Sequence, residues 1–467
     1  MPSPRKIPRQ PTYQTFAPSS AVRHLQRSQM DALPVELLSK IFTSAVHCSH
    51  DLYDSITQPI TISHVCRHWR HVSLSTTALW TTISLLFPLS THQLSRTLAW
   101  LCRSRNRPLH IHMDFRDPSW NWDEASHHFT WKSMENIMRL LLPHARRWQH
   151  VELYTDTWAP IFTFLSYTSH VKSASCLQEI HLARCNAYFA VKGEPFRPTA
   201  MALPVPWFSA GLGLPNLRKV SLGGVHVDWA QSGLSGLKEL ELKYHAQEVM
   251  PTLEEFTAII QACPDLERLA IMGWGPRIDP NMKNHQVISL LHLRKLEFGF
   301  VDVDYAIDLF SLFRIPNLSS LTIEDVTSGL EPCEHHDATR LLDRLNVLGA
   351  QQHPDKVPLA CTPLQCVRTF SLRGVKLGHD AADTITAFLS NFRSLESVLL
   401  SNLDACSLRV FCSVVLANKD ETYLPCLDRL TLRDIDEAAL VDGLAECEGS
   451  ISSSRHIRIF VDAYVGE

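Results

Sequence analysis

A short pattern of apolar residues, apolar-x-x-apolar-x-apolar, recurs along most of this chain and constrains its fold more than any other feature. Its eight good copies lie at 214–225, 234–245, 263–274, 290–301, 315–326, 364–375, 392–403 and 424–435. In the second copy, Leu240 and Leu242 flank Glu241, so both leucines point to one face of a short strand. Repetition of one half-buried strand predicts a repeat architecture.

Segments with an apolar stripe at helical spacing lie between these strands, as at 252–264, 305–316 and 382–392. The combined unit repeats at roughly 25 to 30 residues, which is typical of leucine-rich repeats. No such unit can bury its own strand face, so neighbours must stack around one core and line a concave surface with a parallel sheet. Weaker copies near Trp148, Leu177 and Ile457 extend this α/β solenoid over 148–467, with insertions near 183–213 and 327–363.

A small helical module is expected before the repeats, at 30–85, after a polar, disordered tail at 1–29. Pro34 fits the first turn of a helix, and Glu36 lies where the positive helix end favours an acid. Three apolar segments at helical spacing follow, with a loop at 47–59 after the first: Leu37, Leu38, Ile41, Phe42 and Ala45; Ile62, Val65, Cys66, Trp69 and Val72; Ala78, Leu79, Trp80 and Ile83. Three short helices bury little core, which favours a docking module. A connecting helical segment is expected at 86–147.

The order of residues in this module, LPVELL..IF, then ISHVCRHWR, then ALW..I, resembles the F-box, and especially the F-box-like domains of fungi. The repeats resemble the irregular leucine-rich repeats found behind F-boxes. In that family the helical hairpin packs on a small Skp-family adaptor, which links it to a cullin scaffold. The resemblance implies an adaptor-docking face, with its supporting core, made of Leu33, Pro34, Leu37, Ile41, Phe42, Val65, Cys66, Trp69 and Trp80. The alternative is that these residues form the core of an ordinary helical cap on the repeats.

The concave sheet surface is the expected site for a protein target. By strand alternation, several cations face outward from the sheet, and those expected to bind the target are Lys243, Arg268, Lys295, Arg373, Arg429 and Arg433. Guanidinium groups grip carboxylates and phosphates in a bidentate way, so Arg373, Arg429 and Arg433 raise the hypothesis of an acidic or phosphorylated target segment. The alternative is that these arginines only solvate the surface.

Composition narrows the classes of partner. The formal net charge of −4 over 467 residues is too small to indicate nucleic acid or a charged membrane as the main partner. Thirteen cysteines without a CxxC pair fit neither a disulfide framework nor a zinc ribbon. Basic residues in MPSPRKIPRQ have no apolar segment behind them, and the most apolar stretch, 79–89, is too short to span a bilayer. We therefore expect an intracellular protein, cytoplasmic and/or nuclear.

Catalytic signatures give no convincing match. The chain contains no GxxxxGK[ST], GxSxG or HExxH motif, and the glycines at 211–213 lack the context of a dinucleotide-binding loop. Adjacent side chains such as those at 333–337, CEHHD, rarely build a tetrahedral metal site by themselves. The pair His127 and His128, among several tryptophans, fits amphipathic packing better than a site. We expect neither an enzyme nor a bound cofactor or metal.

Two functions follow from these observations. The first is a substrate-recognition subunit of an SCF-type (cullin-RING) E3 ubiquitin ligase, in which the module docks on the adaptor and the solenoid holds the target. The second is a stand-alone leucine-rich-repeat interaction scaffold that recruits no ligase. A hydrolase or metal enzyme on a repeat frame is disfavoured because no reactive constellation was found.

Overall fold

The computed structural model describes residues 33–48, 51–185, 192–208, 213–279, 287–328, 337–350, 363–417, 423–444 and 457–462. The chain divides into two compact units, Met1–Leu79 and Trp80–Glu467. The tail expected at 1–29 lies outside the described residues. No helix in the described ranges is both long and apolar enough to cross a membrane.

The first unit is a small helical bundle. Its helices are α1 (Val35–His47), α2 (Leu52–Val65) and α3 (Arg67–Ser75), and the 3-10 turn η2 (Thr77–Trp80) leads into the second unit. The buried apolar residues of the bundle include Leu38, Phe42, Val46, Ile56 and Val72. The ring of Trp69 packs on Phe42, with 4.8 Å between ring centroids.

Two helix boundaries in this unit differ from the expectation. Most of the loop expected at 47–59 is helical, because Asp51 caps α2 by accepting a hydrogen bond from the Tyr53 N–H, and Pro59 lies inside the helix. The apolar stripe that we placed on one helix is divided at Cys66, whose backbone is extended. The Cys66 thiol accepts the Trp69 N–H and so begins α3.

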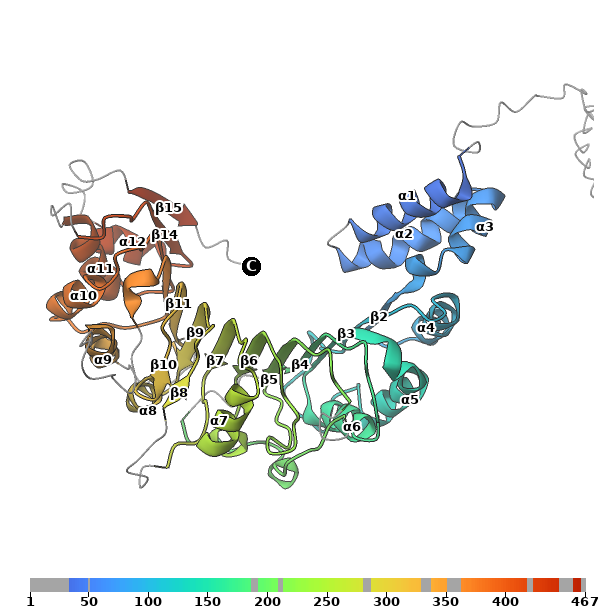
Figure 1. The fold of residues 1–467 in the computed structure, drawn as a ribbon, viewed down its shortest axis with the longest axis horizontal. Helices are drawn as coiled ribbons and strands as arrows, with labels where there is room; N and C mark the ends of the chain where they lie inside the picture. Colours follow the sequence, from blue (N-terminus) through green and yellow to red (C-terminus); the bar gives the residue numbers. More distant parts are fainter. Residues whose placement is uncertain are drawn as a thin grey trace, which may run out of the picture. The chain divides into compact units, whose positions relative to one another are not determined.

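The second unit is built on one parallel sheet of thirteen strands, which lie side by side in chain order (Figure 1). The strands are β1 (Thr82–Leu86), β2 (Leu109–Asp114), β3 (Trp148–Thr155), β4 (Glu179–Arg184), β5 (Lys219–Gly223), β6 (Glu239–Lys243), β7 (Arg268–Met272), β9 (Lys295–Phe300), β11 (Ser320–Asp325), β12 (Thr369–Arg373), β13 (Ser397–Ser401), β14 (Arg429–Arg433) and β15 (Arg458–Asp462). A separate parallel pair joins β8 (Ile288–Ser289) and β10 (Phe313–Arg314).

Helices cover one face of this curved sheet and leave the other face to the strands alone (Figure 1). The covering helices are α4 (Thr91–Arg103), α5 (Trp131–Leu141), α6 (Trp158–Thr168), α7 (Leu253–Gln261), α8 (Val303–Phe310), α9 (Thr339–Ala350), α10 (Ala382–Leu389), α11 (Ala405–Ala417) and α12 (Glu437–Leu444). Leucines such as Leu240 and Leu242 are buried on the covered side. The predicted α/β arrangement, short parallel strands alternating with helices, is therefore confirmed for this unit.

The sheet begins earlier than the repeat pattern placed it. Strand β1 lies in the segment assigned to the helical module, and β2 lies in the segment 86–147 that we expected to be helical. Both pair in parallel with their neighbours, β1 with β2 and β2 with β3. Leu109-His-Ile-His-Met has the alternation of a strand, but Asn106 stands where the repeat pattern has its first apolar residue.

Candidate functional site

Helix α1 carries two apolar stripes. Leu38, Phe42 and Val46 recur every four residues and are buried in the bundle. Beside them runs an exposed stripe: Leu37 is 46% exposed and Ile41 is 45% exposed. Pro34, which caps the helix, and Ala45 continue this stripe and are also exposed. The exposed stripe is an apolar helix face that the bundle itself leaves uncovered.

The other residues predicted to dock an adaptor have different environments. Val65 is 57% exposed at the end of α2. Leu33, Cys66 and Trp69 are half-buried, whereas Phe42 is buried in the bundle core. Trp80 belongs to the second unit, where it is buried against the ring of Trp100 at 5.4 Å and beneath the guanidinium of Arg103 at 4.6 Å. Phe42 and Trp80 therefore support structure and do not offer contact surface.

The uncovered face of the sheet carries three rows of side chains. Because neighbouring strands pair in register from β3 to β15, equivalent residues of successive strands lie next to one another. The central row runs Ser84, His112, Glu152, His181, Ser221, Glu241, Ala270, Glu297, Thr322, Ser371, Leu399, Thr431 and Phe460. All six cations predicted to bind the target lie on this face, in the two outer rows.

The middle strands, β5 to β9, neutralise their own charges. Arg268 contacts Glu241 at 2.5 Å, Glu297 at 3.1 Å and Glu239 at 3.4 Å. Two lysines add ion pairs of 2.7 Å: Lys243 with Glu241 and Lys295 with Glu297. Burial would raise the pKa of Glu241, but the hydrogen bond and charge of Lys243 and the charge of Arg268 hold it below its ordinary value. The three predicted target-binding cations here are therefore occupied by neighbouring glutamates.

On the late strands, β11 to β15, the arginines have fewer or more exposed ion-pair partners than Arg268 has. Arg373 lies 3.7 Å from Glu324, whose pKa is raised because burial outweighs the attraction of this arginine. Arg433 pairs with Asp462 at 3.0 Å, and both side chains are half exposed. The guanidinium of Arg429 lies over the Phe460 ring, 5.6 Å from its centroid. Arg373 and Arg433 share one outer row while Arg429 lies in the other, so the three arginines do not form a single cluster.

The early strands, β2 to β4, combine histidines with carboxylates. His112 binds Glu152 through Nδ1 at 2.8 Å, and this hydrogen bond lowers the pKa of the carboxyl group. His110 stacks on His150 with 4.4 Å between ring centroids. Burial lowers the pKa of His181. This part of the sheet face therefore pairs histidines with carboxylates, whereas arginines predominate on the late strands.

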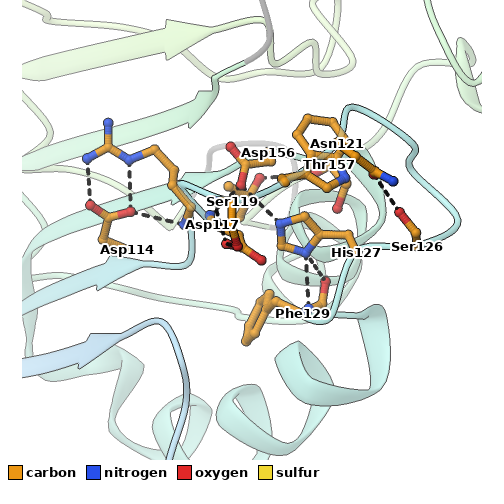
Figure 2. A network of polar contacts seen from close by, with 12 residues as sticks. Asp114, Asp117, Ser119, Asn121, Ser126, His127, Phe129, Asp156 and Thr157 are labelled. Carbon is orange, nitrogen blue, oxygen red and sulfur yellow. Dashed lines mark hydrogen bonds and ion pairs between the residues drawn. The ribbon is translucent and has the colours of Figure 1, made fainter.

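A polar network fixes the loop between β2 and α5 (Figure 2). Two groups of this loop donate hydrogen bonds to one oxygen of Asp156, which follows β3: the Asp117 N–H at 2.7 Å and the His127 Nε2 at 3.0 Å. The Phe129 N–H donates to His127 Nδ1, which places the ring proton on Nε2. Asp156 and His127 are both buried. This network is more specific than the amphipathic packing expected for His127.

The same loop forms one wall of an open depression of about 610 Å³ at the carboxyl ends of β1 to β4. Its lining includes Phe87 after β1, Arg116 and Trp120 in the loop, Asp156 after β3 and Cys185 after β4. The repeat pattern did not identify these residues. The signal was nonetheless present, because polar residues directly after parallel strands gather at one edge of the sheet.

Metal ligands are not gathered anywhere in the described ranges: no three His, Cys, Asp or Glu side chains are arranged to hold an ion. The residues at 333–336 and 211–212 lie outside those ranges. Asp337 is described and lies just before α9, where its Oδ1 accepts hydrogen bonds from the N–H and hydroxyl of Thr339.

Comparison with known proteins adds only weak similarity. No protein-family model matches the chain, and no curated protein matches it. Among solved structures it is similar to a chain of the "Crystal structure of Rad7 and Elc1 complex in yeast", with 13% sequence identity and a TM-score of 0.36. The alignment covers 88% of this chain and 91% of that chain. A TM-score of this size does not establish a shared fold, so the F-box resemblance stays a prediction.

Proposed function

We propose that this chain is the substrate-recognition subunit of an SCF-type E3 ubiquitin ligase. The helical module would dock on a Skp-family adaptor and through it on a cullin scaffold, and the uncovered sheet face would hold the protein target. The ligase would then act by proximity, with the chemistry carried out by its conjugating enzyme. The chain itself needs no catalytic residue for this role.

The observation that carries the proposal is the exposed stripe on α1. Leu37 and Ile41 lie beside the buried stripe and leave nearly half of their surface exposed, whereas Leu38 and Phe42 are buried in the core. An apolar helix face of this kind is stabilised when a partner covers it. The stripe coincides with the positions that the F-box resemblance assigns to adaptor docking, which favours docking over a purely structural cap.

The sheet face supports the second half of the proposal. The face carries polar or charged side chains on most of its strands, and no three metal-ligating side chains are gathered in the described part of it. Solenoid surfaces of this kind bind proteins along their length. The same face would serve a stand-alone scaffold, so adaptor recruitment is the property that distinguishes the two functions.

The test is a pull-down of the full chain from cells with exposed residues changed. Because Leu37 and Ile41 are nearly half exposed, Leu37→Asp with Ile41→Asp should leave the bundle folded and reduce adaptor and cullin recovery at least about tenfold, by removing apolar contact area. Val441→Asp, at a 65% exposed residue of α12, is the matched control and should recover both partners. Absence of adaptor and cullin from the intact chain would overturn ligase recruitment in favour of the scaffold.

A further inference from the structure

The depression at the carboxyl ends of β1 to β4 has an aromatic wall with an exposed tryptophan. Trp120 and Trp122 lie with 5.3 Å between their ring centroids, and Trp122 is 55% exposed. Indole rings are costly to leave in water, and their faces attract cations. The Asp156 network holds this loop in place, so the wall is formed before any ligand arrives.

The charge of the depression is negative. Asp114, Asp117 and Asp156 line it together with one cation, Arg116, so two carboxylate charges are left without a compensating cation in the lining. Arg116 is already occupied, because it forms two hydrogen bonds with Asp114, at 2.6 and 2.9 Å, and lies over the ring of Tyr154. An incoming cation would therefore meet the remaining carboxylates and not a free guanidinium.

Asp117 is the carboxylate best placed for such a ligand. Its Oδ1 accepts both hydrogen bonds that Ser119 donates, at 2.9 Å from the N–H and 2.6 Å from the hydroxyl. These bonds lower its pKa, so Asp117 is ionised at neutral pH. Asp156, in contrast, is buried and receives the Asp117 N–H and His127 on one oxygen.

We propose that this depression binds the guanidinium group of an arginine side chain from a captured protein. A planar guanidinium can stack on an indole face and pair with a carboxylate in the same position, which a lysine ammonium does less well. Arg116 shows the same combination within this chain, with a carboxylate on one side and an aromatic ring on the other. The proposal deepens the function above and rests on it only in that the arginine belongs to the bound target.

The experiment uses the full chain and two blocked tripeptides, acetyl-Gly-Arg-Gly-amide and its citrulline analogue, observed by saturation-transfer NMR. Citrulline has nearly the same shape as arginine but carries no charge. We expect saturation of the arginine side chain and at least about tenfold weaker binding of citrulline. Trp122→Ala and Asp117→Asn should each weaken arginine binding about fivefold or more, because each removes one of the two partners.

Trp131→Ala is the matched control, since Trp131 is 48% exposed on α5 and does not line the depression. It should bind arginine like the unchanged chain. Equal saturation of the two peptides, or equal loss in Trp131→Ala and Trp122→Ala, would overturn the proposal. The adaptor takes no part in this measurement, so a chain that recruits its adaptor but fails here would contradict the arginine site alone.

Discussion

At the scale of single residues, Arg268 is the hub of the middle sheet face. It lies on β7 and contacts three glutamates on the two neighbouring strands, β6 and β9, and the Glu241 side chain among them is only 5% exposed. Ser221 also donates to Glu241, so the carboxylate is enclosed by partners from β5, β6 and β7. Because Arg268 has this many partners, we predict that its main role is to stabilise the fold and not to bind a target.

Replacing Arg268 with methionine keeps most of the volume and removes the charge. We expect the free energy of unfolding to fall by about 1–3 kcal/mol, because Glu241 and Glu297 lose a partner in a half-buried setting. The measurement is the urea midpoint followed by circular dichroism. Arg340→Met is the control: Arg340 and Asp304 are both 71% exposed, so its effect should stay below about 0.5 kcal/mol. Equal losses in the two variants would contradict a special role for Arg268.

Two buried histidines make stability depend on pH. His226 stacks on Trp158 and donates from Nε2 to the Leu203 carbonyl, and His245 donates to the Val225 carbonyl. Burial lowers the pKa of each to about 4, from 6.5 for an unperturbed histidine. Between about pH 6.5 and pH 4 these histidines are protonated in the unfolded chain but neutral in the folded chain. The free energy of unfolding therefore falls as the pH drops below about 6.5 toward 4.

Between about pH 7 and pH 5.5 we expect a loss of about 1 kcal/mol per histidine, seen as a falling unfolding midpoint. His226→Phe keeps the aromatic contact with Trp158 and removes the titrating group, so its midpoint should change less over the same range. A variant as pH-sensitive as the unchanged chain would show that other groups control the effect.

At the scale of elements, strands were predictable wherever two apolar residues flank a polar one, because alternation alone fixes which face is buried. Strand β2 follows this alternation but was missed because Asn106 stands where the repeat pattern has its first apolar residue. Periodicity also could not place the break at Cys66. The apolar stripe continues across Cys66, and only its extended backbone divides α2 from α3. Such a break depends on a local cap, which periodicity does not report.

The candidate sites on the sheet face and in the depression were predictable only in part. Alternation placed Lys243, Arg268 and Lys295 on the correct face but could not reveal their ion pairs, since these need the register of β6, β7 and β9. The wall made by Trp120 and Trp122 was missed because the Asp156 network joins residues far apart in the sequence. Long-range contacts of this kind have no local pattern.

The late strands permit a test of target capture. Reversing Arg373, Arg429 and Arg433 to glutamate should abolish capture of an acidic or phosphorylated target and leave adaptor recovery unchanged, because these arginines lie on the sheet face and not on the helical module. Pull-down followed by mass spectrometry compares the two. Reversing Lys132, Arg139 and Arg340, which are exposed on covering helices, is the charge-matched control. Target capture that survives the first triple reversal would contradict the acidic-target hypothesis.

At the scale of the whole molecule, the sheet face changes character along the chain. On β2 to β4 the face carries histidines and carboxylates. On β5 to β9 it carries lysines and an arginine that form ion pairs with glutamates, and on β11 to β15 it carries arginines. A repeat fold makes this possible because each strand contacts only its neighbours, so one part of the face can vary without disturbing another. The net charge of −4 conceals this variation.

The unbroken register from β3 to β15 gives the sheet face a fixed spacing. Parallel strands lie about 4.8 Å apart, so a ligand that runs across them meets equivalent side chains at that interval. An α-helix advances about 5.4 Å per turn, whereas same-side residues of an extended chain recur about every 6.7 Å. A helix laid across the strands drifts by about 0.6 Å per strand and stays in step over several of them, while an extended segment loses step almost at once. A helix that crosses the strands would therefore match the spacing of this face over more strands than an extended segment would.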